Sequence, residues 1–347
     1  MTLDIQRDVP LAPLTTLGLG GAAKHFLRAV DEAELLEALQ WAAEEGIASA
    51  ILGGGSNLIV PDEGYDGLVI QMAMETLELH RGGKLVAGAG VPWEAVVDAA
   101  LSRDWAGLEC LSGIPGSAGA TPIQNVGAYG QEVSEVIDAV RVLRRSDLVF
   151  AELSAEDCGF CYRDSLFKRE PERFVVTAVR FALRPGAPAT TRYAELARRV
   201  AAHASLADVR SAVLELRRSK SMLLDPADPN HRSAGSFFLN PIVSTEEADR
   251  VVAQAVAEKL AVRPEDVPRY PADDGRTKLA AGWLVEKAGI AKGARRGAIG
   301  VSSRHALALV HHGGGTTAEL LSFADEIRQR VHDRFGVRLE REPRLLA

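Results

Sequence analysis

The chain contains a long glycine-rich segment, residues 112–130, with the sequence SGIPGSAGATPIQNVGAYG. Glycine permits left-handed backbone conformations and lets a ligand approach the main chain closely. We expect this segment to expose backbone N–H groups that no helix or sheet uses, and such groups can form a concavity that binds phosphate. The segment therefore predicts an anion-binding loop.

A second loop of this kind, Gly53-Gly54-Gly55-Ser56-Asn57, follows the short apolar run at residues 50–52. Glycine clusters are most often plain turns, but two such loops together indicate a pyrophosphate site. The sequence GLGGAA at residues 18–23 matches the dinucleotide fingerprint G-x-G-x-x-A. We reject this match, because Pro13 interrupts the segment before it and residues 24–27 read as a strand, where the fingerprint needs a helix.

Length and composition limit the class of protein. A chain of 347 residues exceeds what one core usually holds, so we expect two or three domains. An apolar fraction of 47% and a charged fraction of 25% are typical of soluble globular proteins. The net charge of −7 and the lack of a basic stripe argue against nucleic acid as a partner. No apolar run is long enough to span a bilayer, and the N-terminal residues lack the apolar core of a signal peptide. We expect a cytoplasmic protein.

Three cysteines are too few for a disulfide framework. Cys158 and Cys161 form a C-x-x-C pair, but no second pair completes a zinc site, and the pair does not lie between a strand and a helix as redox motifs do. We therefore expect no metal, and we expect both cysteines to be buried as small apolar residues.

Hydrophobic periodicity predicts alternating helices and strands in a mixed α+β chain. Capping boxes, proline and glycine mark the element ends. The predicted helices cover residues 32–45, 93–101, 206–219, a segment from 245, about 279–287, and 317–335. One predicted strand ends at residue 52, and the others cover residues 68–70, 139–143, 148–153, 174–183 and 306–310. A hairpin is predicted to turn at Gly82-Gly83. The proline-rich residues 224–230 indicate a domain boundary.

Ordered segments of the chain resemble those of the UDP-N-acetylenolpyruvoylglucosamine reductases, also called UDP-N-acetylmuramate dehydrogenases. These flavoenzymes complete the muramic acid unit of peptidoglycan precursors. The resemblance runs over nearly the whole length and is carried by residues 53–58, 114–130, Tyr162-Arg163-Asp164-Ser165, 235–241, 278–283 and 339–342.

The resemblance implies an FAD-binding domain of the vanillyl-alcohol oxidase/PCMH type followed by a smaller α+β substrate-binding domain. By position, the first domain covers residues 1–220, with subdomains of about 1–66 and 67–220, and the second covers 221–338. Residues 339–347 form a tail that returns to the active site. FAD is expected to be bound noncovalently, NADPH to be the co-substrate and UDP-N-acetylglucosamine enolpyruvate to be the substrate. The expected FAD contacts are Gly53, Gly54, Gly55, Ser56, Asn57, Ser112, Gly113, Pro115, Gly116, Gly119, Ala120, Gln124, Asn125, Gly127 and Tyr129.

The family's chemistry implies that NADPH reduces the flavin, which then passes hydride from N5 to the vinyl carbon of the enolpyruvyl ether. Arg163 matches the family's catalytic arginine, and its planar fork suits a carboxylate or enolate. The alternative is a surface arginine paired with Asp164. Ser236 matches the family's proton donor. A serine hydroxyl suits this role because it keeps its proton at neutral pH. The alternative is a serine that only satisfies backbone groups at the start of a strand.

Glu342 corresponds to the family's catalytic glutamate near the C-terminus. Glu340 lies two residues away, and in a strand both would face the same side, so geometry alone does not choose between them. Position relative to Leu339 and Arg344 favours Glu342.

Tyr193 matches the tyrosine of the loop that closes over the nucleotide in the first of the family's two types. The other expected contacts with the substrate are Tyr162, Lys220, Asn240 and Lys287. Two alternative functions remain open at this point. One is a different FAD oxidoreductase on the same flavin domain, and the other is a flavin-binding or nucleotide-sugar-binding protein without catalysis.

Overall fold

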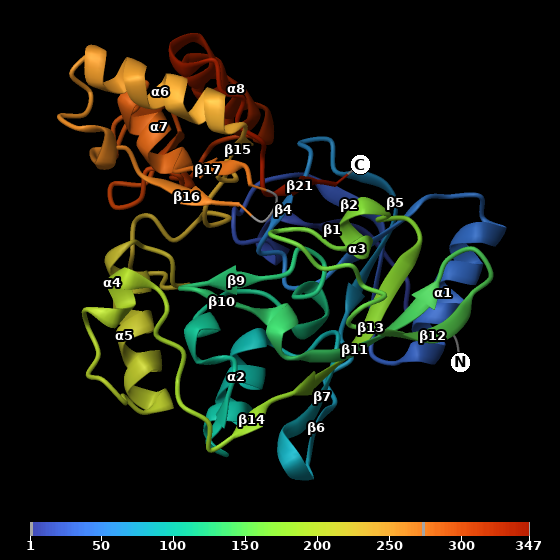
Figure 1. Cartoon of the computed structure of the whole chain (residues 1–347). Coiled ribbons are helices and arrows are strands. Elements are labelled where there is room, and N and C mark those ends of the chain that lie inside the picture. The colour runs from blue at the N-terminus through green and yellow to red at the C-terminus, as the bar shows by residue number, and fades with distance from the viewer. Residues whose placement is uncertain (1–2, 273–274, 347) are drawn as a thin grey trace. The chain divides into compact units, whose positions relative to one another are not determined.

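The computed structural model describes residues 3–272 and 275–346. The chain divides into two compact units. The first comprises Met1–Pro10, Ala22–Gly55 and Tyr65–Leu224, and the second comprises Leu11–Gly21, Ser56–Gly64 and Asp225–Ala347. Figure 1 labels the helices and strands along the chain.

The first unit contains a four-stranded mixed sheet of order β1-β2-β5-β3. β1 is antiparallel to β2, whereas β2 and β3 are both parallel to β5. Helix α1 begins after Asp31, whose carboxylate accepts the Glu34 N–H at 2.9 Å, and its apolar face packs with the sheet in one core cluster. The bounds are β1 (Gln6–Pro10), β2 (Ala22–Ala29), α1 (Glu32–Glu44), β3 (Ser49–Leu52) and β5 (Tyr65–Met72).

A second sheet of the first unit is antiparallel throughout, in the order β12-β11-β13-β7-β6. Helix α2 and the buried Trp93 pack with it in a second core cluster. The bounds are β6 (Leu77–His80), β7 (Lys84–Gly88), α2 (Trp93–Leu101), β11 (Ile137–Arg144), β12 (Val149–Ser154) and β13 (Phe174–Ala182). The short elements are β8 (Trp105–Ala106), β9 (Gly127–Ala128), β10 (Gln131–Glu132), α3 (Leu166–Arg169), β14 (Arg184–Pro185) and α4 (Ala194–Ala197), and the unit ends with the longer helix α5 (Leu206–Ser219).

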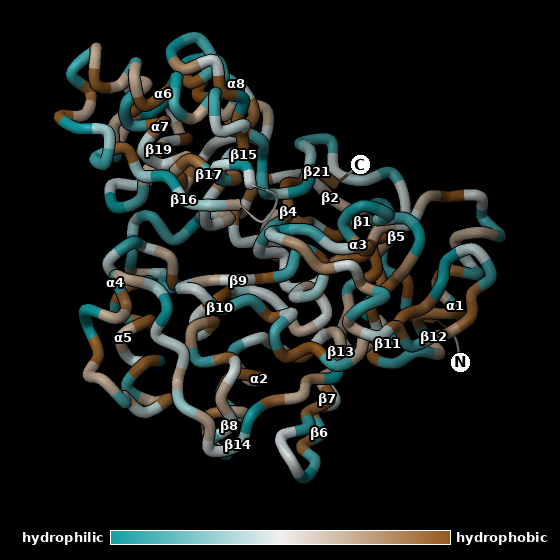
Figure 2. Tube along the Cα trace, viewed as in Figure 1, coloured by the Kyte–Doolittle hydropathy of each residue, from teal (hydrophilic) through white to brown (hydrophobic). Residues whose placement is uncertain are grey.

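The second unit contains two small antiparallel sheets, β15-β17-β16 and β18-β19-β20, and the parallel pair β4-β21. Its helices are α6 (Thr245–Ala257), α7 (Ala281–Lys287) and α8 (Thr317–Phe335). Its strands are β4 (Leu58–Ile59), β15 (Ile242–Val243), β16 (Arg269–Pro271), β17 (Thr277–Leu279), β18 (Arg295–Arg296), β19 (Ile299–Val301), β20 (Leu309–His311) and β21 (Arg344–Leu345). Hydrophobic and hydrophilic residues alternate along α8 (Figure 2), and within residues 3–272 and 275–346 no helix is long and apolar enough to cross a membrane.

Two N-terminal segments belong to the core of the second unit. Leu17, Leu19 and Ile59 lie in the same apolar cluster as Phe237 and α8. A Cβ on Gly20 would lie 2.3 Å from the Cβ of Val60, so the glycines of residues 18–21 permit close chain packing. Because β2 follows directly, GLGGAA is not a dinucleotide fingerprint, as predicted.

The mixed α+β class is confirmed, and the predicted helix at residues 206–219 matches α5. Three expectations differ from the structure. The first sheet extends to Met72, past the predicted subdomain limit near 66, because β5 pairs with both β2 and β3. The strand predicted at 306–310 is shortened to β20, because a turn at His305 occupies its start. Cys161 is exposed, so the prediction that both cysteines are buried was wrong for this residue. Cys161 and Asp164 are hydrogen-bonded across a tight turn.

The contact units also differ from the predicted domain ranges. The break after Leu224 lies at the start of the proline-rich segment, but residues 11–21 and 56–64 group with the second unit. The pairing of β4 with the C-terminal β21 accounts for part of this exchange. The functional assignment of the ranges 1–220, 221–338 and 339–347 stays a prediction.

Candidate active site

The two glycine loops lie against each other in the first unit. A Cβ on Gly54 would lie 2.6 Å from the Gly116 Cα, and a Cβ on Gly53 would lie 3.0 Å from the Ser117 Oγ. No side chain fits at Gly54 without displacing the second loop, so glycine is required there by close backbone approach. The two segments predicted to share a pyrophosphate are therefore neighbours.

The expectation of unused N–H groups holds for the first loop and for part of the long loop, where no hydrogen bond of the described residues uses the N–H of Ile114 or Gly116. Among the hydrogen bonds of the described residues, none uses the N–H of Gly53, Gly54 or Gly55. In the long loop, by contrast, the Gly119 N–H donates to Ala89 and the Ala120 N–H donates to Ser117. The prediction was wrong for these two residues, because a 3-10 turn at Ala118–Ala120 and the end of β7 use their donors.

Gly113 and Ser112 are also committed to structure. The Gly113 N–H donates to the Glu94 carboxylate at 2.6 Å, and its carbonyl accepts from the buried Arg217 at 3.1 Å. The Ser112 hydroxyl donates to the Glu109 carbonyl at 2.8 Å. These bonds hold the start of the long loop, and desolvation lowers the pKa of the enclosed Arg217.

Ser117 is a polar residue of the loop that sequence reasoning missed. Its Oγ is buried and has no hydrogen-bond partner among the described residues, although it faces Gly53. Buried polar atoms are nearly always hydrogen-bonded. An unpaired hydroxyl beside three unused N–H groups is therefore suited to donate, together with them, to the oxygens of a phosphate. Residues 53–55 and 117 thus have the donors that an FAD pyrophosphate needs.

The second half of the long loop has a strained backbone. Asn125 and Tyr129 adopt positive φ values of 47° and 49°. Tyr129 and Gly130 form the two-residue turn between β9 and β10, where both residues take φ > 0. The Asn125 amide donates to Glu132 at 2.8 Å and to the Cys161 carbonyl at 3.0 Å, which ties the loop to the following turn. Strain of this kind persists only where surrounding contacts enforce it.

Arg163 lies in that turn. Cys161 and Asp164 exchange two backbone hydrogen bonds, and Arg163 between them has φ 54°. Its guanidinium donates to the Gly127 carbonyl of the long loop and lies 5.4 Å from the Tyr162 ring. Asp164 forms an ion pair with Arg169 instead. The contacts therefore favour the interpretation of Arg163 as a residue directed at the long glycine loop over that of a surface arginine paired with Asp164.

Four side chains around Tyr193 form a second cluster in the first unit. The Tyr129 and Tyr193 rings meet edge to face with centroids 5.5 Å apart. The Lys220 ammonium lies 5.9 Å from the Tyr129 ring and 2.7 Å from a Glu195 oxygen. Burial raises the pKa of Tyr129 to about 12, so its hydroxyl stays protonated at neutral pH. The structure thus brings together one predicted FAD residue, Tyr129, and two predicted substrate residues.

Ser236 and Glu342 lie on adjacent segments of the second unit. Phe238 and Arg341 form an antiparallel bridge, and the Glu342 N–H donates to the Phe237 carbonyl at 3.0 Å. Glu340 is exposed, whereas Glu342 is half-buried. This difference supports Glu342, although both follow the same extended backbone.

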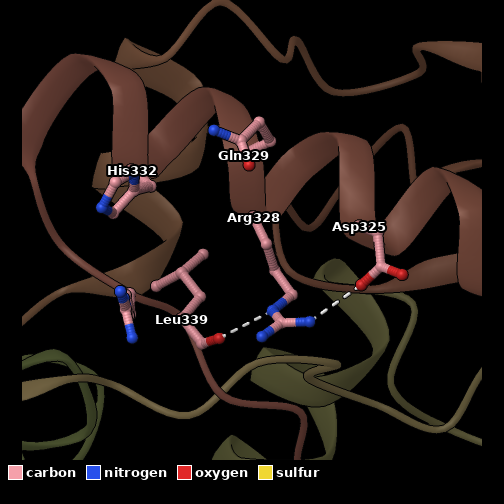
Figure 3. A pocket seen from close by; sticks show the side chains of 6 residues that line it. Asp325, Arg328, Gln329, His332 and Leu339 are labelled. Carbon is pink, nitrogen blue, oxygen red and sulfur yellow. Dashed lines mark hydrogen bonds and ion pairs between the residues drawn. The ribbon is translucent and has the colours of Figure 1, made fainter.

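The C-terminal tail is fixed by further bonds in the second unit. The Asn57 amide donates to the Glu342 carbonyl at 3.3 Å, and the Arg344 N–H donates to the Asn57 carbonyl at 3.1 Å. Upstream, Arg328 donates to the Leu339 carbonyl at 3.0 Å beside a surface hollow of about 420 Å³ (Figure 3). Ser56 and Asn57, predicted as FAD contacts, therefore belong to the same unit as the tail.

Two predicted substrate residues have structural contacts. The side-chain amide oxygen (Oδ1) of Asn240 accepts the Ala281 N–H at 2.9 Å at the start of α7. The Lys287 ammonium lies 5.9 Å from the Trp283 ring in the last turn of α7. Among residues 3–272 and 275–346, no group of three His, Cys, Asp or Glu side chains could hold a metal ion.

Family models match both parts of the chain. An FAD-binding domain model matches residues 23–148, and the model of the UDP-N-acetylenolpyruvoylglucosamine reductase C-terminal domain matches residues 226–346. The reductase of that name from Thermobifida fusca is 48% identical over 99% of this chain and 98% of its own. The chain belongs to the UDP-N-acetylenolpyruvoylglucosamine reductase family.

Other members of the reductase family agree with this assignment. The Streptomyces coelicolor reductase is 46% identical over 97% of this chain and 88% of its own. The crystal structure of the Thermus caldophilus reductase is 26% identical, covers 100% of both chains and superimposes with a TM-score of 0.68. The predicted order of an FAD-binding domain followed by the reductase C-terminal domain is confirmed.

Proposed function

We propose that this protein catalyses the NADPH-dependent, FAD-mediated reduction of UDP-N-acetylglucosamine enolpyruvate to UDP-N-acetylmuramate in peptidoglycan precursor synthesis. Family membership over the full length and the FAD-binding domain match support the reaction class. The observation that carries the proposal is the position of Arg163 on a strained turn bonded to Gly127 of the long glycine loop. A permanent cation held at that loop suits a substrate carboxylate.

The glycine loops at residues 53–57 and 112–129 are proposed to hold FAD without a covalent link. The unused N–H groups of Gly53, Gly54 and Gly55 and the unpaired Ser117 hydroxyl would bind the pyrophosphate. Bound there, FAD would supply the hydride transfer from NADPH to the vinyl carbon of the substrate. The protein supplies binding, orientation and charge.

The chain's own residues manage the charge and the proton. Arg163 is proposed to stabilise the negative charge that develops beside the substrate carboxylate. Ser236 then donates its proton to the carbon next to that carboxylate and regains a proton from solvent, so hydride and proton together saturate the double bond. Glu342 is proposed to act with Ser236 in proton delivery, and the backbone bond between Phe237 and Glu342 supports this pairing.

Tyr162, Tyr193, Lys220, Asn240 and Lys287 are proposed substrate contacts. Tyr193 is 37% exposed and contacts the Tyr129 ring, which Lys220 also approaches, an arrangement suited to a diphosphate group. Its presence supports the family type with the closing tyrosine loop. A cytoplasmic location stays a prediction.

The proposed reaction is tested by mixing the purified protein with NADPH and the enolpyruvyl nucleotide. Oxidation of NADPH is expected to continue beyond one equivalent per FAD only when the enolpyruvyl nucleotide is present, with a product two hydrogens heavier by mass spectrometry. Continuous oxidation of NADPH without the nucleotide would favour a different FAD oxidoreductase. A protein that binds both but turns over neither would be a binding protein without catalysis.

The purified protein is expected to be yellow and to carry about one noncovalent FAD per chain, as one pyrophosphate site predicts. Heat or acid should release the flavin, because none of the matched motifs contains a histidine or cysteine placed to link it. Absorbance of the washed, denatured protein checks this. Flavin that stays with the denatured chain would contradict the proposed mode of binding.

Tyr193→Phe is expected to weaken binding of the nucleotide substrate while reduction of FAD by NADPH stays near the wild-type rate. One lost hydrogen bond to a charged group is worth about 1.5–3 kcal/mol, or roughly 10- to 150-fold in affinity. Phenylalanine keeps the ring contact with Tyr129, so the hydroxyl alone is tested. An unchanged KM would remove Tyr193 from the substrate site.

A further inference from the structure

A buried carboxyl group, that of Glu109, is hydrogen-bonded to the two segments that carry Tyr129 and Tyr193. Glu109 is 0% exposed and accepts hydrogen bonds from the Gly107 N–H at 2.7 Å, the Thr190 N–H at 2.7 Å and the Gln131 amide at 3.2 Å. All of these donors are neutral. No cation among the described residues contacts this carboxyl group, which makes its burial costly and points to a role beyond stability.

The same network reaches both segments that carry the tyrosines. Gln131 follows the turn that presents Tyr129, and its side-chain oxygen Oε1 accepts the Cys110 N–H at 3.0 Å. The Gln131 amide also donates to the Thr190 hydroxyl at 3.3 Å, and the Cys110 thiol donates to the Thr190 carbonyl at 3.2 Å. Thr190 lies three residues before Tyr193 in the chain. The buried Glu109 side chain thus links the β9–β10 turn to the segment that carries Tyr193.

We propose that Glu109 is a positioning residue that fixes the Tyr129–Tyr193 pair by anchoring residues 189–193 to the β9–β10 turn. The segment is otherwise held by the Arg192–Glu135 ion pair, the Tyr129–Tyr193 ring contact and the buried Leu196 of α4. Tyr193 and its neighbour Arg192 are exposed, and the helix that follows, α4, has only four residues. The effect on substrate rests on the proposed function, whereas the anchoring rests on the contacts alone.

Glu109→Gln should break the anchor while keeping the shape of the side chain. The carboxylate presents acceptors to donors at both oxygens, whereas an amide places an NH₂ group against a donor at one of them. We expect hydrogen exchange of residues 187–199 to accelerate roughly ten- to a hundredfold, as lost hydrogen bonds to a charged group predict. Exchange in α2 and β13 should change little, and FAD content should stay near wild type.

Among the kinetic constants of Glu109→Gln, the change should appear in KM for the nucleotide substrate. KM for the enolpyruvyl substrate should rise several-fold, while the rate of FAD reduction by NADPH is unchanged. Uniformly faster exchange and loss of FAD would instead indicate a purely structural role and overturn the proposal. Faster exchange at 187–199 with unchanged KM would support the anchoring and count against Tyr193 as a substrate contact.

A second variant decides the matter if Glu109→Gln does not fold. Gln131→Leu removes the amide that joins Glu109 and the Thr190 hydroxyl to the β9–β10 turn. Thr177→Val is the control for loss of a buried hydrogen bond, since Thr177 donates to Glu32 outside this network. Local acceleration at 187–199 in Gln131→Leu but not in Thr177→Val supports the proposal, and equal exchange in the two variants overturns it.

Discussion

Ser236→Ala is expected to leave reduction of FAD by NADPH near the wild-type rate and to slow reduction of the enolpyruvyl substrate by about 10²- to 10⁴-fold. The first step moves no proton to the substrate, whereas the second lacks its proton donor. The fold should persist, because this segment is held by the Phe237 N–H bond to the Leu307 carbonyl at 2.8 Å and not by the serine hydroxyl. Stopped-flow measurement of the two half-reactions checks this.

Ser236→Cys serves as the matched variant. A thiol keeps its proton at neutral pH and has similar reach, so part of the second half-reaction should return. Equal slowing of both half-reactions in Ser236→Ala, with the protein folded, would show that Ser236 supports the flavin site and is not the acid.

Glu342→Gln is expected to slow the second half-reaction by about 10²-fold or more, within the range of acid–base catalysis, whereas Glu340→Gln should stay near wild type. The substitution removes the charge and keeps the shape. The two glutamates make a matched pair, since each is bonded through its backbone to the segment after Ser236, by Leu239 N–H to Glu340 at 3.0 Å and by Glu342 N–H to Phe237 at 3.0 Å.

Only exposure and position separate the two variants, because Glu340 is exposed and Glu342 is half-buried. Thermal unfolding of both should match, because both variants keep the backbone hydrogen bonds of the tail. A larger decrease in the rate of the second half-reaction in Glu340→Gln than in Glu342→Gln would reverse the assignment of the catalytic glutamate.

Local sequence signals predicted the elements of the fold well. Ser205 and Asp208 form the capping box that begins α5, and Thr316 and Glu319 form the one that begins α8. Such signals depend on neighbours within a few residues. The placement of residues 11–21 and 56–64 in the second unit could not be read this way, because it depends on long-range contacts such as the β4 pairing with β21 and Thr317 N–H to Asp62 at 2.7 Å.

The candidate site was predictable where glycine composition carries the information. Gly54 and Gly116 lie in contact as the paired loops require. The sequence did not distinguish N–H groups that stay unused, as at Gly53, from those that the fold consumes, as at Gly119, since the partner Ala89 lies thirty residues away. Ser117 and Glu109 were missed for the same reason. A serine or glutamate becomes informative only when its burial and its partners are known.

The most direct test of the proposed reaction is a single turnover without oxygen. The protein is first reduced with one equivalent of NADPH, freed of nucleotide and then mixed with UDP-N-acetylglucosamine enolpyruvate. We predict that the visible absorbance of oxidised flavin returns in step with formation of one UDP-N-acetylmuramate per FAD. Flavin that stays reduced in the presence of the enolpyruvyl nucleotide, in protein that binds it, would contradict the account.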